Sequence, residues 1–96
     1  MIVGVARFQL RLPENASLKG KRGVVKSLCA RIQGEFRVAA AEVDQNDLWQ
    51  IAVIGVACVS NERRHADAVL DRVLHFVEES RLDLELLDVE TELIDV

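Results

Sequence analysis

The start of the chain alternates between two sets of positions, which is the pattern of a β-strand. The even-numbered positions are apolar or glycine: Ile2, Gly4, Ala6, Phe8, Leu10 and Leu12. The odd-numbered positions change from apolar to polar: Val3, Val5, Arg7, Gln9 and Arg11. The pattern predicts a strand with one buried and one mixed face. Pro13 ends it, because proline has no N–H to donate to a neighbouring strand.

Two later segments have the period of amphipathic helices. Ser17 is placed to cap the first helix, and Gly34 is placed to end it. The apolar stripe of this helix has i, i+3, i+4, i+7 spacing: Val25, Leu28, Cys29 and Ile32. We expect Ser60 or Asn61 to cap the second helix. Its stripe is the clearest helical signal in the chain: Ala66, Val69, Leu70, Val73, Leu74 and Val77.

Three more strands are predicted around these helices. Phe36–Val43 and Leu48–Ser60 flank a polar turn, Asp44–Asp47, whose side chains are suited to bonding their own backbone. The last strand occupies roughly Leu86–Asp95. Leucines before this strand have the opposite phase to Leu87, so we expect a bulge or loop just before Leu87.

The resulting order is strand, helix, strand, strand, helix, strand. Right-handed crossovers then predict an α+β, ferredoxin-like βαββαβ sandwich. Its four-stranded antiparallel sheet would carry two helices on one face. We expect one such domain over residues 1–96, since 96 residues with half of them hydrophobic suffice for one core.

The long strand at 48–60 is apolar on both faces, although one face of this kind of sheet is uncovered. Exposed apolar patches usually mark contacts, so we expect a homodimer through the open face. The residues expected at this interface are Val3, Val5, Trp49 and Ile94. The alternative is a strand that tolerates exposed aliphatic side chains.

Charge is distributed unevenly along the chain. Residues 1–37 contain eight Lys and Arg against two acidic residues, whereas residues 38–96 contain four against fourteen. Part of this asymmetry has a structural explanation, because Arg7 and Arg11 would lie beside the last strand and its acids. The expected partners are Asp88, Glu90 and Glu92.

The basic residues of the first helix are the candidate nucleic-acid contacts. Lys19, Arg22 and Lys26 have i, i+3, i+7 spacing, and Lys21 lies between them. With Gly20 and Gly23 at its loosely built amino end, this helix is suited to receiving RNA phosphates. The alternative is an ordinary solvated helix face.

Other residues favour no particular chemistry. Glu42, Asp44 and Asp47 cluster at the turn, but no calcium-loop pattern is present, and turn formation explains the aspartates. His65 and His75 form no motif with a nucleophile, and Cys29 and Cys58 read as buried thiols. We therefore expect no enzyme activity, no metal and no other cofactor. Neither a signal peptide nor a membrane span is apparent, so we expect a cytoplasmic protein without membrane contact.

Two stretches resemble the YlxP-like family of small bacterial proteins, a domain of unknown function. The first is Ser17-Leu18-Lys19-Gly20-Lys21-Arg22; the second joins Glu42-Val43-Asp44 to Asp47-Leu48-Trp49-Gln50. The resemblance implies a ferredoxin-like fold and a bacterial cytosolic protein whose gene often lies among translation and ribosome-maturation genes.

The sequence therefore favours a non-enzymatic, dimeric binding protein that engages RNA or a ribosomal subunit through the first helix. The first alternative is a homo-oligomeric regulatory module that binds a small molecule between subunits. The second is an enzyme that uses Glu42, Asp44 and Asp47 with a metal.

Overall fold

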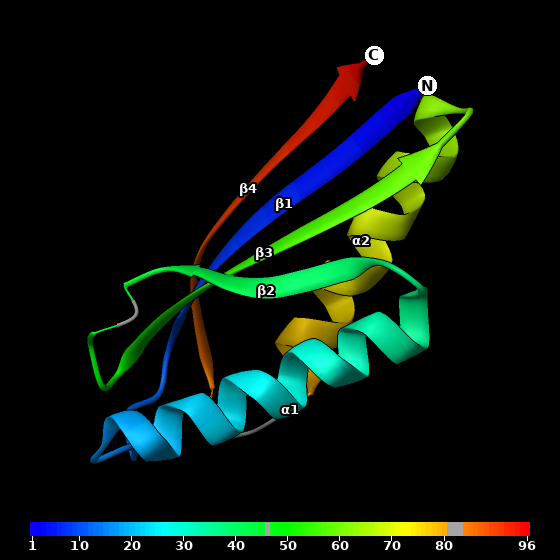
Figure 1. Ribbon diagram of the computed structural model, residues 1–96. Helices are drawn as coiled ribbons and strands as arrows, with labels where there is room; N and C mark the ends of the chain where they lie inside the picture. The colour runs from blue at the N-terminus through cyan, green and yellow to red at the C-terminus, as the bar shows by residue number, and fades with distance from the viewer. Residues whose placement is uncertain (46, 81–83) are drawn as a thin grey trace.

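The computed structural model has the predicted order of elements and describes residues 1–45, 47–80 and 84–96. The helices are α1 (Leu18–Phe36) and α2 (Arg63–Glu79). The strands are β1 (Ile2–Arg11), β2 (Ala39–Asp44), β3 (Ile51–Ser60) and β4 (Glu85–Asp95). They form one antiparallel sheet in the order β2-β3-β1-β4, with both helices on one side (Figure 1). The α+β, ferredoxin-like prediction is confirmed.

The core lies between the helices and one face of the sheet. The even-numbered side chains of β1 and β3 face this layer, and Phe8 and Ile54 are fully buried in it. The helices contribute the predicted stripes, including Leu28 and Ile32 from α1 and Val73 from α2. The apolar residues that alternate in β1 and those that recur with helical period in α1 and α2 therefore line the same core.

The irregularity expected near Leu87 is present as a bulge in β4. Gln9 of β1 pairs with Asp88, whereas the next residue, Leu10, pairs with Leu86, which leaves Leu87 as the extra residue. This bulge returns Leu86 to the helix side of the sheet, where it packs against the core. Leu82 lies outside the described residues.

Several element ends differ from the predictions. Ser17 caps α1 as expected, but the helix continues past Gly34 to Phe36, and its C-cap is Arg37, which has φ 54°. The N-cap of α2 is Glu62, while the Ser60 hydroxyl accepts the Glu62 N–H instead of capping the first turn itself. These ends depend on backbone bonds that hydrophobic periodicity does not report.

Both strands of the central hairpin begin later than predicted. Phe36 is the last helical residue, so β2 begins at Ala39. The strand predicted from Leu48 begins only at Ile51, which leaves Leu48 and Trp49 in the loop. Apolar composition alone suggested strand there, but the side chains of both residues are exposed.

Candidate nucleic-acid interface and open sheet face

The start of α1 and the β2–β3 hairpin meet at one end of the sheet. Lys21 connects them, because its Nζ donates to the carbonyl oxygens of Gln45 at 2.8 Å and Ile51 at 3.1 Å. The same Nζ lies 2.9 Å from Glu42 Oε2. The two stretches that carry the family resemblance are therefore joined by a direct contact.

Lys21 is thus a correction to the predicted phosphate contacts. Its side chain is 0% exposed, so its ammonium group cannot reach a polyanion in solution. The sequence contained a signal for this, since positions 21, 25, 28, 29 and 32 all lie on the buried stripe of α1. A buried lysine requires a counter-ion and acceptors, which Glu42 and the hairpin carbonyls supply.

Glu42 is committed to this inner contact. Its side chain is 14% exposed, and its buried Oε2 makes an ion pair with Lys21 without hydrogen-bond geometry. Asp44, two residues later, instead pairs with Arg7 on the open face at 2.6 Å. Glu42 and Asp44 therefore lie on opposite faces of the sheet. Within the described residues, no three His, Cys, Asp or Glu side chains are grouped to hold a metal ion.

The buried thiols are poor nucleophiles. Burial raises the pKa of Cys29, and the nearby Glu42 carboxylate raises it further. Burial also raises the pKa of Cys58, although a backbone hydrogen bond from Gly4 partly opposes this. Because the thiolate is the reactive form, both cysteines are suited to packing rather than chemistry.

A second set of bonds holds the loop that carries Trp49. The Asn15 side-chain amide donates to the carbonyl oxygens of Ser17 and Trp49. The Gln50 amide donates to the carbonyls of Pro13 and Asn15 at 3.4 and 3.3 Å. Trp49 is held by its backbone while its side chain remains 55% exposed. An aromatic side chain is thereby presented to solvent beside the start of α1.

Gly20 makes room for this arrangement. A Cβ at position 20 would collide with the Asn15 side chain and would lie 3.2 Å from Ser17 Oγ. Asn15 and Ser17 therefore cover the amino end of α1, which does not form the open phosphate cradle suggested by its glycines. Gly23 has open space around its Cβ position, and nothing in the structure requires a glycine there.

The remaining basic residues, Lys19, Arg22 and Lys26, are exposed along α1. Arg22 and Lys26 line a groove of about 400 Å³ between α1 and β2, whose wall includes Ala41. In the part of the chain that the structure describes, no acidic side chain lies within ion-pair distance of these three residues. The structure thus places three of the four predicted basic residues on an accessible surface.

The residues predicted for a dimer interface are divided between the two ends of the sheet. Val3 lies between Val59 and Ile94 at one end of the open face. Trp49 lies beyond Ile51, which pairs with Arg11 at the other end. Val3 and Arg11 are eight positions apart along β1, or about 26 Å. Trp49 therefore belongs to the α1 end of the molecule and not to the valine patch.

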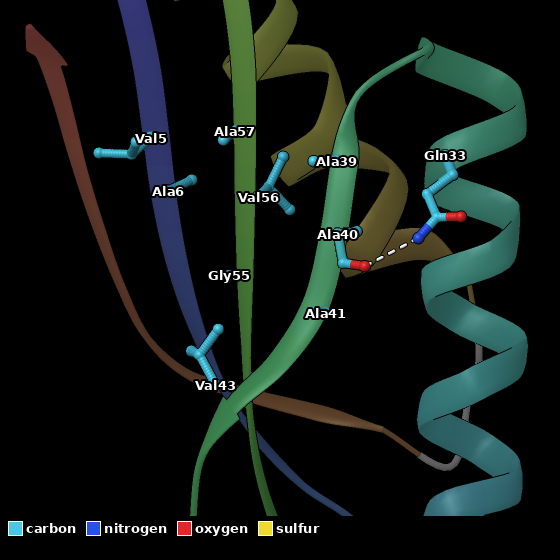
Figure 2. Close-up of a pocket in the computed structure, with 10 residues that line it drawn as sticks. All are labelled: Val5, Ala6, Gln33, Ala39, Ala40, Ala41, Val43, Gly55, Val56 and Ala57. Carbon is cyan, nitrogen blue, oxygen red and sulfur yellow. Dashed lines mark hydrogen bonds between the residues drawn. The ribbon is translucent and has the colours of Figure 1, made fainter.

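Small residues complete the apolar half of the open face. A shallow groove of about 420 Å³ lies on β1, β2 and β3, and Figure 2 shows the residues that line it. Its lining includes Val5, Ala39, Ala41, Gly55 and Ala57. Sequence reasoning missed this groove, because its alanines are too small to register as an apolar patch until β2 and β3 pair.

The arginines of the open face form ion pairs with other residues than those predicted. Arg7 pairs with Asp44 across the sheet, and Arg11 lies 3.8 Å from Glu85. The Gln45 N–H and then the Arg7 guanidinium lower the pKa of Asp44. The predicted partners, Asp88, Glu90 and Glu92, make no ion pair with any described residue. The β2–β3 hairpin extends over the open face, where Asp44 pairs with Arg7. Arg7 therefore does not pair with the acids of β4.

The Ser60 hydroxyl lies 3.2 Å from His65 Nδ1, a contact that the sequence did not indicate. The same oxygen accepts the Glu62 N–H at 3.0 Å. Both contacts are at the solvent-exposed start of α2, so this pair positions a helix end.

No helix in the described ranges is both long and apolar enough to cross a bilayer.

The comparisons with known proteins agree with these observations. The family model described as "Protein of unknown function (DUF503)" matches residues 3–91. The uncharacterized protein YlxP of Bacillus subtilis (strain 168) is 35% identical over 77 residues, covering 80% of this chain and 84% of that protein. The solved structure of the de novo designed protein Foldit4 has a TM-score of 0.61 at 15% identity, covering 100% of this chain and 99% of that chain. The last likeness concerns the fold alone. The chain belongs to the DUF503 family of YlxP-like proteins.

Proposed function

We propose that this protein is a non-enzymatic RNA-binding protein that associates with ribosomal RNA or a ribosomal subunit. The observation that supports the proposal most is the exposed basic face of α1, formed by Lys19, Arg22 and Lys26. These cations have no acidic partner among the described residues, although the chain has a net charge of −4. Polyanions bind such surfaces by releasing counter-ions.

Trp49 extends the proposed interface beyond the basic residues. Its exposed indole belongs to a loop held against the start of α1 by Asn15. Aromatic side chains stack on bases in single-stranded nucleic acid and tolerate any sequence. We assign phosphate contacts to Lys19, Arg22 and Lys26, and base stacking to Trp49. The preferred ligand is then single-stranded RNA.

Salt dependence tests the phosphate contacts. Three contacts to a single strand predict a slope of about −2 for log affinity against log salt, at about −0.7 for each contact. The K19Q/R22Q variant should reduce the slope to about −0.7, measured by fluorescence anisotropy with a labelled single-stranded RNA. The R64Q/R72Q variant removes two charges from α2 and is the matched control. Equal slopes for the two variants would refute the proposal.

Co-sedimentation tests the ribosomal partner. Wild type should sediment with purified ribosomal subunits at low salt and be released as salt rises, while K19Q/R22Q should stay in the supernatant. Binding that is insensitive to salt and unchanged by the two substitutions would contradict a ribosome-binding interface on α1.

Stacking has a direct spectroscopic test, because Trp49 is the only tryptophan in the chain. Single-stranded RNA should quench its fluorescence, and double-stranded RNA of equal length should quench it less. Replacing Trp49 with alanine should weaken binding by about 1–3 kcal/mol without changing the salt slope. Unquenched fluorescence in saturated complexes would remove Trp49 from the interface.

We also propose that two copies associate through the apolar half of the open sheet face. The supporting observation is the row Ile94, Val3 and Val59, which continues into the groove of Figure 2. Sedimentation velocity should detect a dimer at micromolar concentration, and Val59→Asp should abolish it. The alternative function, small-molecule regulation, depends on the same dimer, because a second copy is needed to enclose this groove.

A further inference from the structure

The strand register divides the open face into levels. Glu90 of β4, Arg7 of β1, Gly55 of β3 and Ala41 of β2 form one such level. Directly opposed residues in antiparallel strands point to the same side of the sheet. The level therefore begins with a carboxylate at one edge and ends with an alanine at the other. The next level runs in the same way, from Glu92 through Val5 to Ala39.

The unpaired charges beside the two edges of the sheet have opposite sign. On the β4 edge, Asp88, Glu90 and Glu92 are exposed and without ion-pair partners in the described ranges. On the β2 edge, Arg22 and Lys26 of α1 lie beside Ala41, because all three residues line one groove. The sheet order places β4 at the edge opposite β2, and Figure 2 shows α1 beyond the β2 edge. The unpaired acids and the unpaired bases thus occupy equivalent levels at opposite edges.

Two simple two-fold arrangements would bring the open faces together. An axis across the strands would set β4 of one copy on β4 of the other and bring carboxylates together. An axis along the strands would keep every residue at its own level and exchange the edges. Glu90 of each copy would then face the Ala41 level of the other, where Arg22 and Lys26 lie. Electrostatic complementarity therefore selects the second arrangement.

We propose that a second copy of this chain docks face to face about a two-fold axis along the strands. Glu90 and Glu92 of each copy then face Arg22 and Lys26 of the other, around an apolar centre at Val5 and Ala57. This geometry rests on the proposed dimer through the open face. It adds the orientation and the charged contacts that select the partner.

The face has the size and shape that such a dimer needs. Three strands of about ten residues and the six residues of β2 cover roughly 570 Å², before side-chain relief is counted. A standard interface buries about 800 Å² on each partner. Ala39, Ala41 and Ala57 leave little side-chain volume above β2 and β3, so a second sheet can approach closely there, while Val43 fills the space above Gly55.

Edge-to-edge pairing is a less favourable way to assemble. A two-fold pairing of β4 edges would align acidic strands with each other, and such charges oppose edge pairing. At the β2 edge, the Gln33 amide already donates to the Ala40 carbonyl, the bond drawn as a dashed line in Figure 2, with an N–O distance of 2.8 Å. That carbonyl is therefore occupied, and assembly through the face avoids both obstacles.

A charge-swap experiment tests the orientation. The E90K/E92K variant and the R22E/K26E variant should each dimerise at least about tenfold more weakly than wild type, because each places like charges together twice. In a 1:1 mixture both contacts regain opposite charges, so the heterodimer should approach wild-type affinity. Sedimentation equilibrium with one fluorescently labelled partner measures all three affinities. The controls E78K/E79K and R64E/R72E make the same changes of charge on α2 and should dimerise normally.

The outcomes separate the orientation from the dimer itself. A wild type that is monomeric at 100 μM would overturn both. A dimer that is abolished by Val59→Asp but keeps its affinity in both charge variants would overturn the orientation and keep the open-face dimer. Val59 is 68% exposed, so a folded Val59→Asp variant is expected, and circular dichroism verifies this. Weakened charge variants without rescue in the mixture would also overturn the proposed pairing. Arg22 and Lys26 belong to both proposed interfaces, so RNA and the second copy compete for them. Lys19 and Trp49 lie outside the dimer contacts and report RNA binding alone.

Discussion

Replacing Lys21 with methionine should destabilise the fold more than any other change to the basic residues of α1. The substitution keeps the apolar length of the side chain but removes the ammonium group. Glu42, 14% exposed, then loses its counter-ion, and the carbonyls of Gln45 and Ile51 lose a donor. Removing one partner of a buried ion pair typically costs about 3–5 kcal/mol. Domains of this size have only about 5–15 kcal/mol of stability.

The expected loss is large enough to measure in two ways. In urea, the free energy of unfolding of K21M should fall by about 3–5 kcal/mol, followed by circular dichroism at 222 nm. In a thermal scan, the midpoint should fall by roughly 12–40 °C, at about 4–8 °C for each kcal/mol. The double variant K21M/E42L removes both charges and should recover much of the loss, because a well-packed apolar pair can replace a buried ion pair.

The same variant separates structure from RNA binding. Because Lys21 is buried, folded K21M at low temperature should bind RNA with the salt slope of wild type. Lys19→Met is the matched control, since it should leave stability within about 0.5 kcal/mol and reduce the slope. A K21M protein within 1 kcal/mol of wild-type stability, or one with a reduced salt slope, would refute the structural role assigned to this lysine.

Two further predictions follow from single positions. Gly20→Ala should lower the free energy of unfolding despite the better helix propensity of alanine, because its Cβ collides with Asn15. Gly23→Ala faces open space and should raise the free energy of unfolding by about 0.5–1 kcal/mol; urea titrations measure both changes. Arg7→Gln should raise the pKa of Asp44 in an NMR titration but leave it below its ordinary value, because the following backbone N–H is the larger cause. Since folding lowers this pKa, the associated stability is present above the unfolded pKa and is lost as pH falls through the folded one; an Asp44 pKa that is insensitive to Arg7 would contradict the ion pair.

Local patterns determined the elements and their order. Side chains in a strand alternate and those in a helix recur every 3.6 residues, so the buried faces of β1, α1 and α2 could be read directly. The bulge at Leu87 could also be predicted, because the leucines before it have the opposite phase of alternation. Lys21 was predictable too, because it falls in phase with Val25 and Leu28 on the buried stripe of α1. The spacing of Lys21 predicted a buried position, although its charge suggested an exposed one.

The pairing of distant side chains was decided only by the tertiary structure. Arg7 had acids available on both sides, and it binds Asp44 because the β2–β3 hairpin extends over the open face. Trp49 left the expected valine patch because the loop before Ile51 is bound to Asn15 at the far end of the sheet. Spacing along the chain specifies which face of an element a residue occupies. The registers between strands and the bonds of the loops determine what that residue meets, and these depend on contacts between segments far apart in sequence.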